Sequence, residues 1–224
     1  ANLVLAFDAA VTGGSGNVSI RLASDGSTVE AIAVGSGQVT GSGTSIITVD
    51  PSVTLSASTA YYIHVAGAAF DDVAGNSFAG ITDTTTWSFT TADTTAPTIT
   101  DVSSSAANGS YNAGDIIDID VTFSEAVTST GNVTVTLETG TTDQTCTFTV
   151  SNATTGTCDY TVQAGDTSSD LTTNSISGTI ADQSSNAMSN FTPTTNLAAN
   201  KALVIDTTNP TISTLSPTDG ATDV

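Results

Sequence analysis

Basic residues are almost missing from this sequence, which has 2 Lys and Arg against 22 Asp and Glu and a formal net charge of −20. Binding to nucleic acid depends on Lys and Arg side chains that contact phosphate groups, so this charge excludes a nucleic-acid partner. The same deficit excludes attraction to an anionic membrane surface. Because few basic side chains are available for ion pairs, many carboxylates are free to bind metal cations. Hard oxygen ligands of this kind suit calcium.

Histidine, cysteine and long apolar runs are also scarce. One histidine and two cysteines exclude a zinc site built from clusters of these residues. The single histidine, His64, lies in an alternating segment that points it outward, and we expect no enzymatic activity from this chain. No apolar run approaches the roughly 20 residues of a membrane helix, so we expect no direct membrane insertion.

Thr, Val and Ile are abundant, and this composition favours strands. Apolar and polar residues alternate in many short segments between Gly, Asn, Asp and Ser. The inward positions of two such segments are Leu3, Leu5 and Phe7, and Ile117, Ile119, Val121 and Phe123. Alternation of this kind is typical of half-buried antiparallel strands, so the sequence predicts an all-β fold of the sandwich type.

The two halves of the chain repeat each other. "LAFDAAVTGGSGNVSIRLASDG" matches "VTFSEAVTSTGNVTVTLETG", and "TADTTAPTIT" matches "VIDTTNPTIS". Asp93 and Asp206 occupy equivalent places, so the repeat length is 113 residues (206 − 93). We therefore expect a window cut out of phase from a longer array: residues 1–92 form a domain lacking its first strand, 93–208 a complete domain, and 209–224 the first strand of a following repeat.

The order F-[SD]-x-A-V, G-N-V, D-x-x-G-N and D-T-T-x-P resembles the bacterial immunoglobulin-like repeat domains of large secreted or surface proteins of the adhesin type. This resemblance implies tandem Greek-key β-sandwiches at the cell surface or outside the cell, in the stalks of adhesins and biofilm proteins. The second copy departs from the pattern at "DQSSN", where Ser185 replaces the usual glycine.

Oxygen-bearing side chains are predicted to meet at one end of each sandwich. In this topology the start of the first strand, the loop after the second strand and the loop after the sixth strand share an end. For the second domain these places hold Asp93, Glu125, Asp182 and Asn186, and for the first domain Asp8, Asp71, Asp72 and Asn76. Asp206 is the counterpart of Asp93, and a neighbouring repeat would complete that second site head to tail.

Calcium is the cofactor that these clusters predict, because it takes 6–8 oxygen ligands. The resemblance implies the same, since such repeats commonly bind calcium where domains join. The alternative is that these acids are solvated loop residues, because Asp and Asn favour turns in any case.

The two cysteines, Cys146 and Cys158, lie in "CTFTVSNATTGTCDY" on alternating segments around a turn-like stretch. This spacing predicts a hairpin with a cross-strand disulfide, which would contribute about 3 kcal/mol and would require an oxidising compartment. Two free thiols are the alternative.

Three hypotheses about function follow. The first is a calcium-rigidified spacer in a long extracellular repeat protein, whose partners are neighbouring repeats or copies arranged head to tail. The second is a filament subunit that donates its C-terminal strand to the incomplete first domain of the next copy. The third is an adhesive module that binds an unknown surface ligand, a glycan or a protein, through exposed loops.

Overall fold

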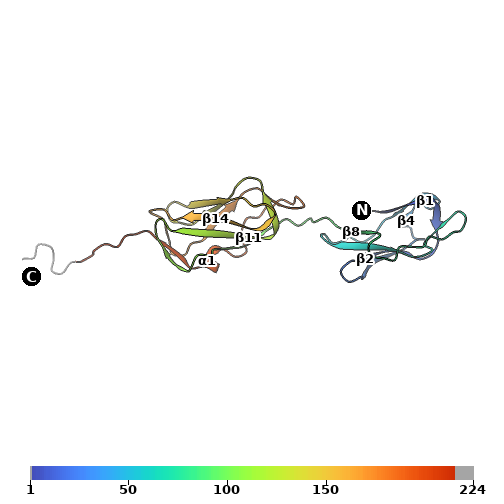
Figure 1. Ribbon diagram of the computed structural model, residues 1–224, viewed down its shortest axis with the longest axis horizontal. Helices are drawn as coiled ribbons and strands as arrows, with labels where there is room; N and C mark the ends of the chain where they lie inside the picture. Colours follow the sequence, from blue (N-terminus) through green and yellow to red (C-terminus); the bar gives the residue numbers. More distant parts are fainter. Residues whose placement is uncertain (1, 215–224) are drawn as a thin grey trace, which may run out of the picture. The chain divides into compact units, whose positions relative to one another are not determined.

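The structure is a computed structural model that describes residues 2–214, and it is almost entirely built of strands. The chain divides into two compact units, with the boundary between Thr94 and Thr95 (Figure 1). The sequence placed this boundary between residues 92 and 93. Within residues 2–214 the one α-helix is α1 (Leu197–Asn200), and no helix there is long and apolar enough to cross a membrane.

Two four-stranded sheets form the first unit. One has the order β4-β5-β1-β7 and the other β3-β2-β6-β8. Their bounds are β1 (Leu3–Gly13), β2 (Asn17–Leu22), β3 (Thr28–Ala33), β4 (Val39–Thr40), β5 (Thr44–Val49), β6 (Ala60–Val65), β7 (Phe70–Asp72) and β8 (Ser88–Thr90). Consecutive strands lie in different sheets at several steps, so inward side chains of both sheets, such as Ile20, Ile47 and Ile63, share one core.

The second unit repeats this plan with more strands. Its sheets have the orders β14-β11-β17 with β9 also on β11, β13-β12-β16, and β10-β18-β15. Their bounds are β9 (Ile99–Ser103), β10 (Gly109–Tyr111), β11 (Ile116–Ser129), β12 (Val133–Leu137), β13 (Gln144–Phe148), β14 (Ala153–Thr161), β15 (Thr167–Ser168), β16 (Thr173–Ser177), β17 (Ile180–Asp182) and β18 (Leu203–Asp206). Most neighbours are antiparallel, whereas β10 and β18 are parallel.

Alternation along β11 is as the sequence predicts. Ile117, Ile119 and Val121 are fully buried, and Phe123 is 3% exposed. With two such strand-built units, the prediction of tandem immunoglobulin-like Greek-key β-sandwiches is confirmed.

The disulfide joins Cys146 in β13 to Cys158 in β14, with an S–S distance of 2.03 Å. The disulfide bond is as predicted, but the prediction that its two strands form a hairpin is wrong. β13 belongs to the β13-β12-β16 sheet and β14 to the β14-β11-β17 sheet, so the bond connects the two sheets across the core. The turn between them, in which Asn152 has a φ of 48°, carries the chain from one sheet to the other instead of folding it back within one.

The predicted first strand of a following repeat falls at residues 209–224. Residues 209–214 are described and form no strand, and residues 215–224 lie outside the described part of the chain. Ile212, in the described part, is 79% exposed.

Candidate metal centre

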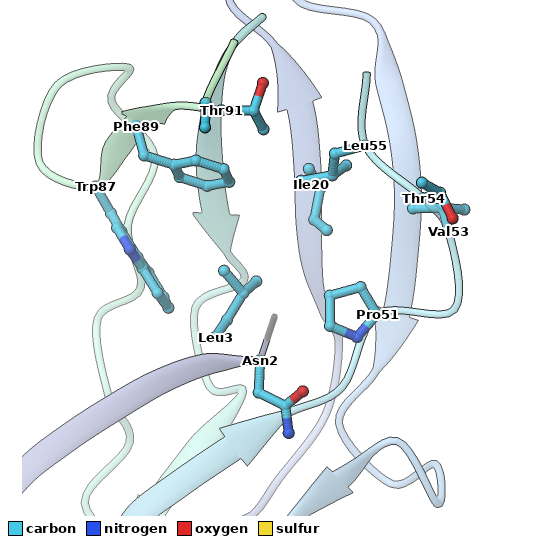
Figure 2. A pocket seen from close by; sticks show the side chains of 11 residues that line it. Asn2, Leu3, Ile20, Pro51, Val53, Thr54, Leu55, Trp87, Phe89 and Thr91 are labelled. Atoms are coloured by element: carbon cyan, nitrogen blue, oxygen red, sulfur yellow. The ribbon is translucent and has the colours of Figure 1, made fainter. Parts of the chain in front are cut away.

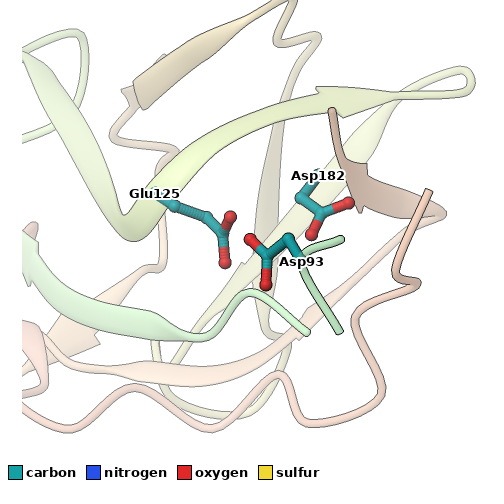
Figure 3. A group of neighbouring side chains, drawn as sticks. All are labelled: Asp93, Glu125 and Asp182. Carbon is teal, nitrogen blue, oxygen red and sulfur yellow. The ribbon is translucent and has the colours of Figure 1, made fainter. Parts of the chain in front are cut away.

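Three carboxylates from three separate segments meet beside β11 in the structure. Asp93 lies in the stretch that leads to β9, Glu125 lies in β11, and Asp182 ends β17. One carboxylate oxygen of each lies within 4.8 Å of the other two (Figure 3). Figure 3 shows the three carboxylate groups turned toward one another. Asp182 is buried, and the other two side chains are half-buried.

An irregularity in β11 places Glu125. The pairing of β11 with β14 shifts its register between Thr122 and Val127, and Glu125 lies in that interval. Val127, two residues after Glu125, pairs with Asp182 of the antiparallel strand β17. A bulge turns side chains out of the regular inward and outward alternation. Glu125 therefore lies at the same end of the sheet as Asp182.

The segment that carries Asp93 is held on β11 by a reciprocal pair of hydrogen bonds. The backbone N–H of Ser124 donates to the carbonyl of Thr98 at 2.9 Å, and the N–H of Thr98 donates to Ser124 Oγ at 3.0 Å. Pro97, next in the segment, is buried. These contacts fix the approach to β9 immediately beside Glu125, which brings Asp93 within reach of the other two acids.

Asn186 donates two hydrogen bonds to the carboxylate of Asp182. Its backbone N–H donates to Asp182 Oδ1 at 2.7 Å, and its side-chain Nδ2 donates to Oδ2 at 2.8 Å. These contacts orient the Asp182 carboxylate, and the role of Asn186 as a ligand stays a prediction.

Burial raises the pKa of the Asp182 carboxyl, but the hydrogen bonds from the side chain and the backbone of Asn186 outweigh that effect and lower the pKa. The carboxyl group is therefore ionised at neutral pH, as a metal ligand must be. Two like charges 4.8 Å apart repel each other by about 1 kcal/mol in water and about 3 kcal/mol at an effective dielectric constant of 20. A divalent cation among the three carboxylates would remove this repulsion.

The first unit has the same loop but not the same cluster. Asn76 donates to Asp72 through its backbone N–H (2.8 Å to Oδ1) and its Nδ2 (2.8 Å to Oδ2), as Asn186 does to Asp182. These contacts lower the pKa of Asp72 as well. The adjacent Asp71 instead accepts a hydrogen bond from Ser77 Oγ at 2.5 Å.

Asp8 does not occupy the place of Glu125. "FDAAV" and "FSEAV" align Asp8 with Ser124 and Ala9 with Glu125, so the first unit has no carboxylate at the Glu125 position. Within residues 2–214, the group of three acids that meets the 4.8 Å distance is that of Asp93, Glu125 and Asp182. The prediction of a matching set in the first unit misjudged the alignment by one residue, which on a strand means the opposite face.

Asp206, the counterpart of Asp93, ends β18. Its Oδ1 accepts a hydrogen bond from the N–H of Thr208 at 2.9 Å. Completion of a second site by this residue from a neighbouring repeat stays a prediction.

His64 lies in β6 between inward neighbours Ile63 and Val65, both fully buried. Its ring is half-buried and lies edge-on to Tyr62, with the ring centroids 5.2 Å apart. The absence of enzymatic activity stays a prediction.

The fold and the comparisons together define the class of protein, which is a tandem array of immunoglobulin-like β-sandwiches. Residues 1–91 match the family model described as "Bacterial Ig-like domain". The first unit is therefore a bacterial Ig-like domain, and the resemblance to this group is confirmed there. No curated protein and no solved structure matched the chain. Bacterial Ig-like domains typically occur in surface proteins.

Proposed function

We propose that this chain is a structural spacer segment of a long extracellular repeat protein, such as an adhesin or a biofilm stalk, and that calcium makes it rigid. The cluster of Asp93, Glu125 and Asp182 within 4.8 Å is the observation that carries the proposal. Three carboxylates can supply three to six of the 6–8 oxygens that calcium takes, and backbone carbonyls and water would supply the rest.

Calcium is favoured over other metals by the chemistry of the ligands. All three acids offer hard oxygen atoms, and residues 2–214 contain no cysteine thiol outside the disulfide. Extracellular calcium sites commonly have dissociation constants of about 10⁻⁴ to 10⁻³ M, which suits an ion present at millimolar concentration outside cells.

The ion would make the chain rigid because its ligands come from two different parts of the chain. Asp93 belongs to the stretch before β9, whereas Glu125 and Asp182 belong to the sheet of the second unit. Without an ion the three carboxylates repel one another, which weakens the attachment of this stretch to the sheet. With an ion it is held against β11, and a spacer built from such repeats bends less at each connection.

Thermal unfolding with calcium and with a chelator tests this proposal. At 1 mM calcium and a dissociation constant of about 10⁻⁴ M, binding adds about 1.4 kcal/mol to the free energy of unfolding of the second unit. We expect the melting temperature of that unit to rise by roughly 5 °C. Cleavage by a protease between residues 92 and 98 should also slow in calcium.

Glu125→Gln should abolish the calcium-dependent shift. Glu138→Gln is the matched control, since Glu138 is an exposed glutamate of the same unit outside the cluster and the substitution removes the same charge. If parent and Glu125→Gln melt at the same temperature with calcium as with chelator, the second unit is a plain sandwich and the metal proposal is wrong.

The filament and adhesive hypotheses are further candidates for the same chain. The first requires strand exchange between copies, and the second requires a ligand at exposed loops. A role at the cell surface is common to all three.

A further inference from the structure

An apolar pocket opens beside the start of β1 in the first unit. Its volume is about 660 Å³. Figure 2 shows Trp87 and Phe89 on one side of it, and Leu55 and Pro51 on the other. Leu3 also lines the pocket and, like both aromatic side chains, is only half-buried. A hollow of this size lined by large apolar side chains is a place where a sandwich core lacks a cover.

In the second unit, a further strand covers the edge of β11 next to the counterpart of Leu3. β9 pairs with β11 from Asp120 to Phe123, and Ile99 and Val102 of β9 are fully buried. The chain then continues past Asp118, whose carboxylate accepts a hydrogen bond from the N–H of Ser105 at 2.8 Å.

The corresponding edge of β1 has no strand on it within residues 2–214. β1 pairs with β5 on one side from Leu3 to Ala6, and with β7 only from Val11 to Gly13. Leu3 is the counterpart of the fully buried Ile119. The N–H and C=O groups of an uncovered edge form a template for another strand.

The described end of the second unit holds a segment that matches β9 and its approach. "DTTNPTIS" (206–213) is identical to "DTTAPTIT" (93–100) at six of eight positions. Ile212 is the counterpart of Ile99, but Ile212 is 79% exposed, whereas Ile99 is fully buried. The described residues therefore include both an edge of β1 without a strand on it and a segment that matches the strand on the same edge in the second unit.

We propose that residues 210–214 of a second copy of this chain add to the open edge of β1 as an antiparallel strand. The pairing of β9 with β11 sets the register, with Ile212 opposite Phe7 and Thr214 opposite Ala6. Main-chain hydrogen bonds give such strand addition its affinity, and the alternate side chains give it specificity.

Asp8 has a defined part in this arrangement. Its counterpart Ser124 donates its backbone N–H to Thr98 and accepts the N–H of Thr98 on Oγ. The carboxylate of Asp8 would accept the N–H of Thr211 in the same way.

Sedimentation velocity of the full chain in a chelator tests the proposal independently of calcium. We expect the mass to rise from 22.2 kDa toward multiples of it as the concentration increases. Ile212→Asp should hold the mass at 22.2 kDa, because it places a charge where the strand must bury a side chain. Asn209→Asp is the control and should associate like the parent, since Asn209 is exposed and lies outside residues 210–214.

Cross-linking tests the register and the occupant. Ala6 and Thr214 are both exposed, so a mixture of Ala6→Cys chains and Thr214→Cys chains should form a disulfide-linked dimer on oxidation. Ala6→Cys mixed with Thr211→Cys should form several-fold less. Three outcomes would overturn the proposal: a parent chain that stays monomeric at high concentration, an Ile212→Asp chain that associates equally, or an Ala6→Cys and Thr214→Cys mixture that cross-links no more than the Ala6→Cys and Thr211→Cys mixture.

Discussion

β1 of the first unit and β11 of the second unit carry the same alternating apolar side chains, but these side chains are buried to different extents. Ile119, Val121 and Phe123 are at most 3% exposed, whereas their counterparts Leu3 and Phe7 are half-buried and Leu5 is 8% exposed. All six residues are apolar and alternate in the same way. The difference arises because β9 lies beside β11, whereas no strand within residues 2–214 covers that edge of β1. Burial at these positions is thus a property of the neighbouring strand and not of the side chain alone.

A second contrast concerns the acidic loops. The Asp72–Asn76 and Asp182–Asn186 loops make the same pair of hydrogen bonds, so both units hold an oriented carboxylate. A cluster forms only where Glu125 stands in β11, and Ala9 occupies that position in the first unit. The Asp72–Asn76 loop thus differs from the candidate metal centre at two places, because Ala9 aligns with Glu125 and the counterpart of Asp93 is Asp206 in β18.

The largest expected effect comes from truncating the two counterparts Ile119 and Leu3. Ile119→Ala should lower the free energy of unfolding of the second unit by about 3 kcal/mol, because it leaves a cavity in a closed core. Leu3→Ala should cost about 1 kcal/mol or less in the first unit, because Leu3 is still partly in water. Denaturant unfolding checks both, with fluorescence of the single tryptophan, Trp87, reporting on the first unit.

Ile47→Ala is the control for the first unit, since Ile47 is fully buried and should cost as much as Ile119. Equal costs for Leu3 and Ile119 would show that the start of β1 is as well covered as β11.

A smaller effect on the free energy of unfolding is expected from separate substitutions at the equivalent loop residues Gly75 and Ser185. Both have positive φ, 86° and 69° respectively, and only glycine adopts this region without a steric cost. Ser185→Gly should stabilise the second unit by about 1 kcal/mol, and Gly75→Ser should destabilise the first by about the same amount. A Cβ at Gly75 meets nothing within 4 Å, so the effect measures the backbone alone. Melting temperatures that move in the same direction for both substitutions would contradict this account.

The smallest effect concerns acid sensitivity. Burial raises the pKa of Asp118, but hydrogen bonds from Ser104 and Ser105 outweigh it and lower the pKa. Because the folded-state pKa is lowered, the ionised carboxylate stabilises the second unit above the unfolded-state pKa of about 4. That contribution is lost as the pH falls through the folded-state pKa. The counterpart in the first unit is Asn2, which does not titrate.

Asp118→Asn should therefore flatten the dependence of the second unit's melting temperature on pH between about pH 5 and pH 2, and leave the first unit unchanged. An Asp118→Asn chain with the same acid profile as the parent would remove Asp118 as a cause of acid sensitivity.

Local pattern was enough to predict the strands and much of the site. The inward face of β11 could be read directly, because alternation depends only on neighbouring residues. The convergence of Asp93, Glu125 and Asp182 could be anticipated because Greek-key topology determines which loops share an end.

Features that depend on distant pairing were missed. Whether β13 and β14 belong to one sheet or two is decided by their partners β12 and β11, so the disulfide was placed in a hairpin that does not exist. Asp8 was matched to Glu125 because both are acidic. Its position along the strand corresponds to Ser124, whose side chain lies on the opposite face from that of Glu125 in a regular strand.

The parallel pairing of β10 with β18 has a mechanical consequence. Gly109, Ser110 and Tyr111 lie opposite Leu203, Val204 and Ile205, in strands near the entry and the exit of the second unit. A tensile force applied to the two ends of this unit would pull the parallel strands in opposite directions along their length. All the hydrogen bonds between them would then be loaded together in shear and not opened one after another. We expect such a patch to resist extension until it ruptures as a whole, which is the behaviour that a tether under flow would require.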